Sequence, residues 1–116
     1  MQQRQTTTKS DIKEAFIQLL ATRNLEDITI SQLTKKAGVN RSTFYLHYLD
    51  KQDFLEQLKE ETITTVRMIL RKETFYPKEA LEAILSYFQE NSAFFAEIAK
   101  IQAFVLQTIF VLLFWE

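Results

Sequence analysis

The chain has 116 residues, of which 47% are hydrophobic and 25% charged, and its formal net charge at pH 7 is −1. This length suits one domain or a small domain with an appended region, and the hydrophobic content argues against disorder. The absence of cysteine excludes disulfides and thiolate metal sites, and a single histidine excludes His-rich metal sites. We therefore expect no metal and no cofactor.

One glycine and one proline leave little material for strands and hairpins, so the predicted fold is all-α. The N-terminal octapeptide has no apolar core and does not resemble a signal peptide, so a cytoplasmic protein is expected. Charge is unevenly distributed: residues 1–51 carry a net +3 and residues 52–116 a net −4. A basic N-terminal part on an acidic remainder fits DNA binding. The alternative is that the charged residues are distributed by chance.

The first predicted helix runs from about Ser10, its N-cap, to Thr22. Its apolar residues recur at steps of three and four, which is typical of an amphipathic helix: Ile12, Ala15, Phe16, Leu19 and Leu20. A second helix opens at Thr29, which forms a capping box with Gln32. Its buried stripe is expected to be Ile30, Leu33 and Ala37.

Gly38, the only glycine, is expected to end the second helix, because glycine adopts positive φ without steric cost. Asn40 is positioned to cap a third helix from Arg41 to about Tyr48, in which Phe44 and Tyr48 face inward. Two short helices joined by a glycine-bearing turn form the unit that places a recognition helix in the DNA major groove. The pattern therefore predicts a helix-turn-helix.

Asp50 with Asp53 indicates a second capping box, which starts a long fourth helix reaching about Lys72. Pro77 is expected to begin a fifth helix, because proline is favoured in the first helical turn. That helix should bury an apolar stripe formed by Ala80, Leu81, Ile84, Leu85 and Phe88. Asn91 and Ser92 then break the chain and cap a sixth segment.

The sixth segment is apolar on all sides from Ala103 to Trp115, which predicts burial in a larger body or in lipid. It is short for a membrane span, which needs about 20 apolar residues. A subunit interface or core is the favoured interpretation. Membrane contact and a chain that is cut short are the alternatives.

The stretch from Lys9 to Leu58 resembles the DNA-binding head of the TetR/AcrR family of bacterial transcriptional regulators. The resemblance rests on the Thr29 cap, the Ala-Gly-Val turn at 37–39, the aromatic residues around His47, and Lys51 opening the fourth helix. It implies a DNA-binding domain at residues 1–58. Residues 59–116 would form a helical region for dimerisation and effector binding.

Arg41 is the best candidate for reading a base, because a guanidinium can donate two hydrogen bonds to guanine O6 and N7. Ser42 and Thr43 suit a base edge or a phosphate, and the resemblance implies that Tyr45, His47 and Lys51 hold the phosphate backbone. The start of the second helix would anchor another phosphate. The predicted DNA contacts are Thr29, Ser31, Arg41, Ser42, Thr43, Tyr45, Leu46, His47 and Lys51, with Lys9 and Arg4 reaching from the N-terminal arm.

We therefore predict a homodimeric repressor whose recognition helices enter successive major grooves of a palindromic double-stranded operator, about 34–36 Å apart. The apolar C-terminal helices would form the dimer, and the resemblance implies release by a small-molecule effector. Phenylalanines that could line its pocket are Phe88, Phe94, Phe95 and Phe104, although such a stripe is also typical of a core.

Two other functions stay open: a regulator that recruits a partner protein, and an all-α interaction module acting through its apolar C-terminal surface. An enzyme is not expected. The carboxylates of Glu60 and Glu61 fall on a periodic helix and have the pattern of surface charge.

Overall fold

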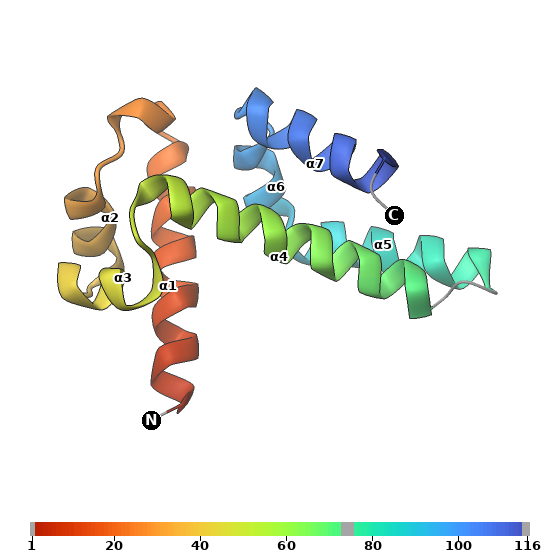
Figure 1. Cartoon of the computed structure of the whole chain (residues 1–116), viewed down its shortest axis with the longest axis horizontal. Helices are drawn as coiled ribbons and strands as arrows, with labels where there is room; N and C mark the ends of the chain where they lie inside the picture. The colour runs from red at the N-terminus through yellow and green to blue at the C-terminus, as the bar shows by residue number, and fades with distance from the viewer. Residues whose placement is uncertain (1, 73–75, 115–116) are drawn as a thin grey trace. The chain divides into compact units, whose positions relative to one another are not determined.

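The computed structural model describes residues 2–72 and 76–114, with side chains described from residue 7 onward except at 72, 102 and 103. Within these residues the chain contains helices and no strand, which confirms the predicted all-α class (Figure 1). The elements are α1 (Gln2–Leu20), the 3-10 turn η1 (Leu25–Asp27), α2 (Ile30–Ala37), α3 (Arg41–His47), α4 (Lys51–Lys72), α5 (Pro77–Glu90), α6 (Ser92–Ile98) and α7 (Gln102–Phe114).

The chain forms two compact units, Met1–Leu55 and Glu56–Glu116, and their boundary falls inside α4. We refer to them as the N-terminal unit and the C-terminal unit. The domain boundary that we predict at residue 58 stays a prediction.

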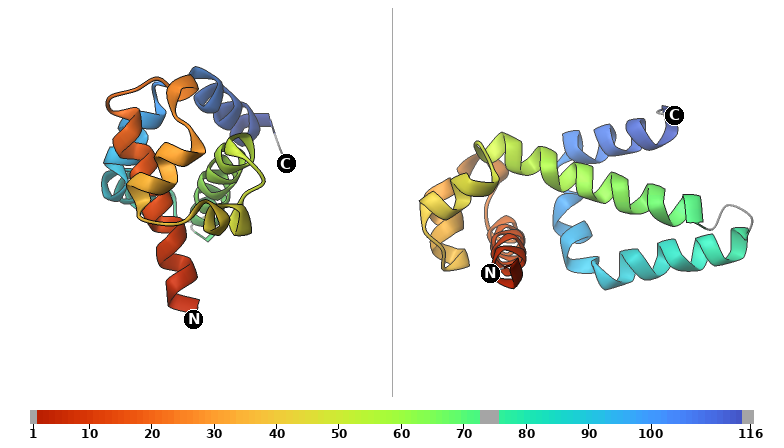
Figure 2. Two further views of the ribbon diagram at one scale, coloured as in Figure 1. Left: turned by 90° about the vertical axis from the view of Figure 1, so that its left-hand side faces the viewer. Right: turned by 60° about the horizontal axis from the view of Figure 1, so that its bottom comes forward.

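An aromatic cluster holds the N-terminal unit together, and Phe54 lies at its centre. The Phe54 ring meets Phe16 and Tyr48 edge-on, with centroids 5.1 Å and 5.0 Å away, and Phe44 lies 6.1 Å away. Phe16, Phe44 and Phe54 are fully buried. Around this cluster α2 packs against both α1 and α3 (Figures 1 and 2). The core thereby fixes the position of α3 on the helices beneath it.

The limits of α1 differ from the prediction. The helix begins at Gln2 instead of Ser10, and Ser10 lies exposed in the helix interior. Residues 2–9 contain neither Gly nor Pro, so no residue there prevents a helix from extending toward the N-terminus. The helix ends at Leu20, because the amides of Thr22 and Arg23 both donate to the carbonyl of Leu19. The side chain of Arg4, a predicted DNA contact, lies outside the described residues.

In the C-terminal unit α5 begins at Pro77, as predicted, but the predicted burial of its apolar stripe is wrong. Leu81, Leu85 and Phe88 are 59%, 53% and 42% exposed, and Ala80 and Ile84 are only partly buried. Periodicity places these residues on one face of the helix. Periodicity does not show whether another helix of the same chain packs against that face.

The predicted sixth segment is two helices, because the chain turns at residues 99–101. The amide of Lys100 donates to the carbonyl of Glu97, and the amide of Ile101 donates to the carbonyl of Ile98. Phe94, Ile98 and Phe104 are buried, whereas one side of α7 is exposed at Leu106, Ile109, Phe110, Leu113 and Phe114. Trp115 lies outside the described residues. Among the described helices, none combines the length and apolar character that a membrane span requires.

Candidate nucleic-acid interface

The turn between α2 and α3 is built on Gly38, which has φ 74° and ψ 29°. Its amide donates to the carbonyl of Lys35 at 3.2 Å, and the amide of Val39 donates to the carbonyl of Thr34 at 3.0 Å. These two bonds complete a Schellman motif, in which the residue after the helix adopts the left-handed conformation. The prediction of positive φ at Gly38 is confirmed. A Cβ atom on Gly38 would meet nothing within 4 Å, so the requirement for glycine concerns φ and not space.

Gly38→Val is expected to lower the free energy of unfolding by about 1–3 kcal/mol, because a β-branched residue is strained at positive φ. Gly38→Asn is the matched control, since asparagine tolerates the left-handed region better and also adds a Cβ. Urea unfolding of the two variants measures the difference. Equal losses would contradict the conformational explanation, because both side chains enter open space.

The capping box at the start of α2 is confirmed. The amide of Gln32 donates to the hydroxyl oxygen of Thr29 at 3.1 Å, and the amide of Thr29 donates to Oε1 of Gln32 at 3.1 Å. Because the Thr29 oxygen acts as the acceptor, its hydroxyl proton is left to donate to a phosphate. Ser31 is exposed in the same first turn, where backbone amides lack intrahelical acceptors. This helix terminus can therefore receive an anion.

Asn40 occupies the N-cap of α3 but makes no capping hydrogen bond through its side chain, so that part of the prediction is wrong. The backbone carbonyl of Asn40 makes the first hydrogen bonds of the helix instead. The carbonyl of Asn40 accepts from the amides of Thr43 and Phe44 at 3.0 Å and 3.3 Å, which begins the helix.

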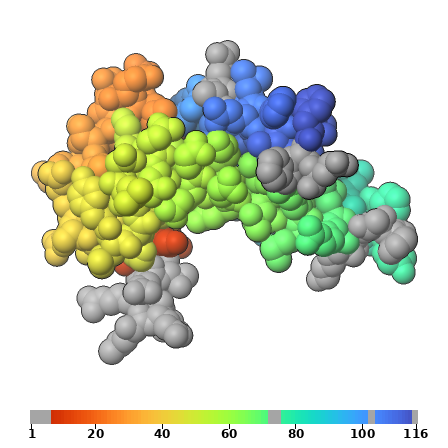
Figure 3. All heavy atoms as spheres, in the orientation of Figure 1, coloured from red at the N-terminus to blue at the C-terminus, as the bar shows by residue number. Residues whose placement is uncertain are grey.

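The two faces of α3 divide as predicted into a buried and an exposed side. Phe44 and Tyr48 are buried, whereas Arg41, Ser42, Tyr45 and Leu46 are exposed. Figure 3 shows part of α3, coloured yellow, at the surface of the N-terminal unit. Burial of one side therefore determines which side chains a duplex can meet.

Arg41 and Tyr45 form a pair on the exposed side of α3. Nη2 of Arg41 donates to the Tyr45 hydroxyl at 3.3 Å, and the guanidinium carbon lies 5.9 Å from the centroid of the Tyr45 ring. The hydroxyl accepts this bond, so its own proton is left for a phosphate oxygen. The pair thus places a guanidinium and a phenol side by side on the surface proposed to meet DNA.

Thr43 and His47 are half-buried, unlike the rest of the predicted recognition side. They line a hollow of about 530 Å³ together with Thr7, Asp11 and Asn40. The carboxylate of Asp11 makes this hollow unsuited to a phosphate. Contacts of Thr43 and His47 with a duplex stay a prediction.

Lys51 has a role that the sequence analysis missed. Its Nζ donates to the carbonyls of Leu25 and Ile28, each at 2.9 Å, and so joins the start of α4 to the segment preceding α2. An ammonium has three N–H donors, so one stays available to a phosphate. The contacts bridge 23 and 26 residues of sequence, and no local pattern signals them. Lys51 thus positions the segment before the Thr29 cap, and its contact with a phosphate stays a prediction.

Lys51→Ala is expected to lower the free energy of unfolding by about 1–2 kcal/mol, because two carbonyls lose a charged donor in a partly buried place. Lys35→Ala, at an exposed position in α2, is the control that removes the same charge and should change stability by no more than about 0.5 kcal/mol. Thermal and urea unfolding measure both. A Lys51→Ala protein as stable as Lys35→Ala would show that the two hydrogen bonds contribute nothing.

The start of α4 follows the predicted capping box only in part. The amide of Asp53 donates to Oδ1 of Asp50 at 2.8 Å, as predicted. Oδ2 of Asp53, however, accepts from the amide of Leu49 at 2.8 Å, one residue before the expected position. The side chain of Asp53 therefore stabilises the connection between α3 and α4 by accepting a hydrogen bond from it.

Residues 12–58 match the family model of the bacterial regulatory proteins of the tetR family. Over these residues the chain is similar to the TetR family. The matched region starts within α1, ends in α4, and contains every predicted DNA contact from Thr29 to Lys51.

One relative is an uncharacterized HTH-type transcriptional regulator, YxbF, from Bacillus subtilis (strain 168), which is 28% identical over 104 residues. The alignment covers 78% of this chain and 26% of the relative, so the chain spans about a quarter of that protein's length. No solved structure matches the chain.

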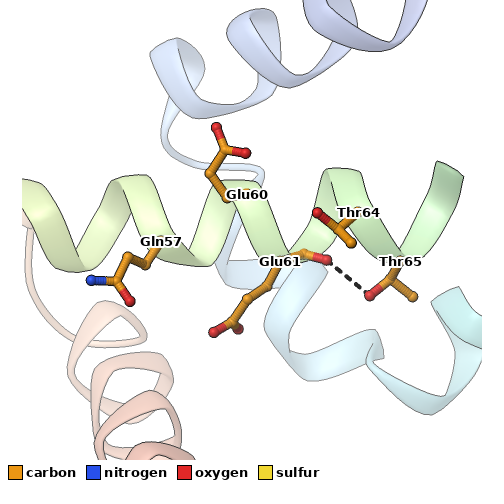
Figure 4. Close-up of a pocket in the computed structure, with 5 residues that line it drawn as sticks. All are labelled: Gln57, Glu60, Glu61, Thr64 and Thr65. Atoms are coloured by element: carbon orange, nitrogen blue, oxygen red, sulfur yellow. Dashed lines mark hydrogen bonds between the residues drawn. The ribbon is translucent and has the colours of Figure 1, made fainter. Parts of the chain in front are cut away.

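In the C-terminal unit, α4 carries the carboxylates of Glu60 and Glu61 beside a shallow hollow of about 340 Å³ (Figure 4). Figure 4 shows the two side chains projecting to different sides of the helix. The hydroxyl of Thr65 donates to the backbone carbonyl of Glu61 at 2.8 Å, which is an ordinary intrahelical contact. The two carboxylates are exposed and do not converge, so this hollow offers no acid–base pair.

The four phenylalanines predicted for an effector pocket are not all equivalent. Phe88, Phe95 and Phe104 line an apolar cavity of about 240 Å³ in the C-terminal unit. Phe94 is buried and does not line it, although its ring contacts Phe95 and Phe104 at centroid distances of 5.2 Å and 6.5 Å. An effector site in the C-terminal unit stays a prediction.

Proposed function

We propose that the protein is a DNA-binding transcriptional repressor that binds a palindromic operator as a homodimer. The observation that carries this proposal is the division of α3 behind the Gly38 turn: Phe44 and Tyr48 hold the helix on the core, and Arg41, Ser42, Tyr45 and Leu46 stay exposed. A helix presented in this way fits the major groove. The tetR family match supports the same function.

In this proposal α3 supplies the sequence-specific contacts, with Arg41 reading a guanine and Ser42 and Thr43 contacting neighbouring base edges or phosphates. Phosphates would be held at the α2 terminus and around the α3–α4 connection, by Thr29, Ser31, Tyr45, His47 and Lys51. Phosphate contacts fix the register of a protein on a duplex but carry no sequence information themselves.

The homodimer would form through the apolar surfaces of the C-terminal unit. Leu81, Leu85 and Phe88 of α5 are exposed, and so is the outer side of α7. Exposed apolar surfaces of this kind mark interaction sites in proteins. Release from the operator would follow when an effector binds the C-terminal unit and favours a different spacing of the two heads.

Selection of bound sequences from random duplexes tests the proposal directly. We expect an inverted repeat, two chains per selected duplex by native mass spectrometry, and an affinity that falls steeply between about 50 and 200 mM salt. If no sequence is enriched and association with other macromolecules is insensitive to salt, the chain is an apolar interaction module instead. An enriched site without inverted symmetry would contradict the homodimer.

A further inference from the structure

The apolar cavity of the C-terminal unit is lined by helices from four parts of the sequence. Thr62 and Val66 come from α4 and Phe88 from α5, while Phe95 and Ile98 come from α6 and the remaining wall from α7. None of the described residues that line it is charged. An ionised ligand would lose its hydration there without gaining a partner, which is strongly unfavourable. The cavity therefore selects for a neutral ligand.

Among the described residues of the lining, the polar side-chain groups are two threonine hydroxyls, one on α4 and one on α7. The hydroxyl of Thr62 donates to the carbonyl of Leu58 at 3.0 Å, and the hydroxyl of Thr108 donates to the carbonyl of Phe104 at 2.7 Å. Each hydroxyl has a single proton, which this bond uses, so each oxygen is left as an acceptor. A ligand that is complementary to the cavity must therefore supply an N–H or O–H donor.

The size and the aromatic side chains of the cavity restrict the ligand further. Its volume is about 240 Å³, whereas an apolar cavity of about 150 Å³ accommodates benzene. One ring would leave space unfilled, and two fused rings are the better match. Phe88 and Phe95 lie with centroids 4.5 Å apart and ring planes at 56°, so a flat ligand meets both a ring face and a ring edge.

We infer that this cavity binds a neutral, bicyclic aromatic molecule that carries one hydrogen-bond donor. The inference names the chemistry of the effector in the proposed function, and its regulatory meaning rests on that proposal. Binding of the ligand to the cavity does not depend on the proposed function, because it is measured on the protein without DNA.

Isothermal titration calorimetry of the full chain without DNA tests the ligand class with three probes. Indole provides two fused rings and one N–H, N-methylindole keeps the rings without the donor, and indole-3-acetate adds a charge. We expect indole to bind about 5- to 10-fold more tightly than N-methylindole, which is the effect of one hydrogen bond. Indole-3-acetate should not bind at the concentrations that saturate the cavity with indole.

Paired threonine variants locate the contact. Thr62→Val and Thr108→Val each remove an acceptor and keep the shape of the side chain, and one of them should abolish the preference for indole over N-methylindole. Thr64→Val makes the same change at an exposed position of α4 outside the cavity and should keep the preference. Val66→Phe should fill the cavity and abolish binding of both neutral probes.

The outcomes separate the inference from the proposed function. Absence of indole binding, including absence because a second copy of the chain seals the cavity, overturns the inference. Equal affinity for indole and N-methylindole overturns the donor requirement, and tight binding of indole-3-acetate overturns the requirement for neutrality. Indole that binds but fails to release a selected operator argues only against its role as effector. A selection that yields no operator argues against the proposed function, and the calorimetric result still stands.

Discussion

Phe54→Ala is expected to lower the free energy of unfolding of the N-terminal unit by about 3–5 kcal/mol, which is the usual effect of truncating a buried aromatic side chain. Phe54 is fully buried, and its ring contacts Phe16, Phe44 and Tyr48. Each of these neighbours would border the resulting cavity. Because small domains have a total stability of about 5–15 kcal/mol, the change removes a large part of it.

The effect of Phe54→Ala is measured by urea unfolding followed by circular dichroism, with Leu49→Ala as the control. Leu49 is 82% exposed in the same unit, so its truncation should change stability by no more than about 0.5 kcal/mol. If Phe54→Ala unfolds at the same urea concentration as Leu49→Ala, the aromatic cluster is not the core of this unit. The expected loss of DNA binding would follow from unfolding, since α3 depends on the cluster for its position.

The features that sequence reasoning predicted correctly are those determined within a few residues. The Thr29–Gln32 box joins residues three apart, and the Gly38 turn is closed by bonds that span three and five residues. Burial of Phe44 and of the C-cap residue Tyr48 follows from their four-residue spacing along α3. Such features depend on local geometry, which a sequence specifies directly.

The features that sequence reasoning missed depend on groups far apart in the chain or on the absence of a signal. Lys51 contacts carbonyls 23 and 26 residues away. Every residue has a backbone carbonyl, so the sequence does not indicate which carbonyls accept from Lys51. The start of α1 lies eight residues before the predicted N-cap, because a serine can sit in a helix interior as well as at its end. The exposure of α5 depends on which partner covers it, and periodicity identifies a face without naming its neighbour.

The same distinction applies to the candidate DNA site. Its residue types and their order on α3 could be predicted, because they follow helical spacing. The pairing of Arg41 with Tyr45 was not predicted, although the two residues are four apart on one helix, where side chains meet. Helical spacing was therefore a signal that could have revealed it.

Arg41→Ala is expected to reduce discrimination among operator sequences, with a loss of about 1–3 kcal/mol per half-site at the base that Arg41 reads. In a homodimer the change occurs twice, so affinity for the preferred operator should fall by about 1,000-fold if two losses at the midpoint of that range add. Affinity for unrelated duplexes should change much less. Dissociation constants for the selected operator, and for the same duplex with one base pair changed per half-site, measure the ratio at a fixed salt concentration.

Two further variants decide what the Arg41–Tyr45 pair contributes. Arg23→Ala removes the same charge from an exposed position after α1 and should leave the operator ratio unchanged. Tyr45→Phe keeps the ring beneath the guanidinium and removes the hydroxyl that accepts from Nη2, so it should reduce the ratio less than Arg41→Ala does. If Arg41→Ala instead weakens all duplexes alike and lowers the salt dependence, Arg41 contacts phosphate, because only a base contact changes the ratio between sequences. In that case the specificity of α3 would have to come from Ser42, Thr43 and Leu46, whose shorter side chains must approach the bases more closely.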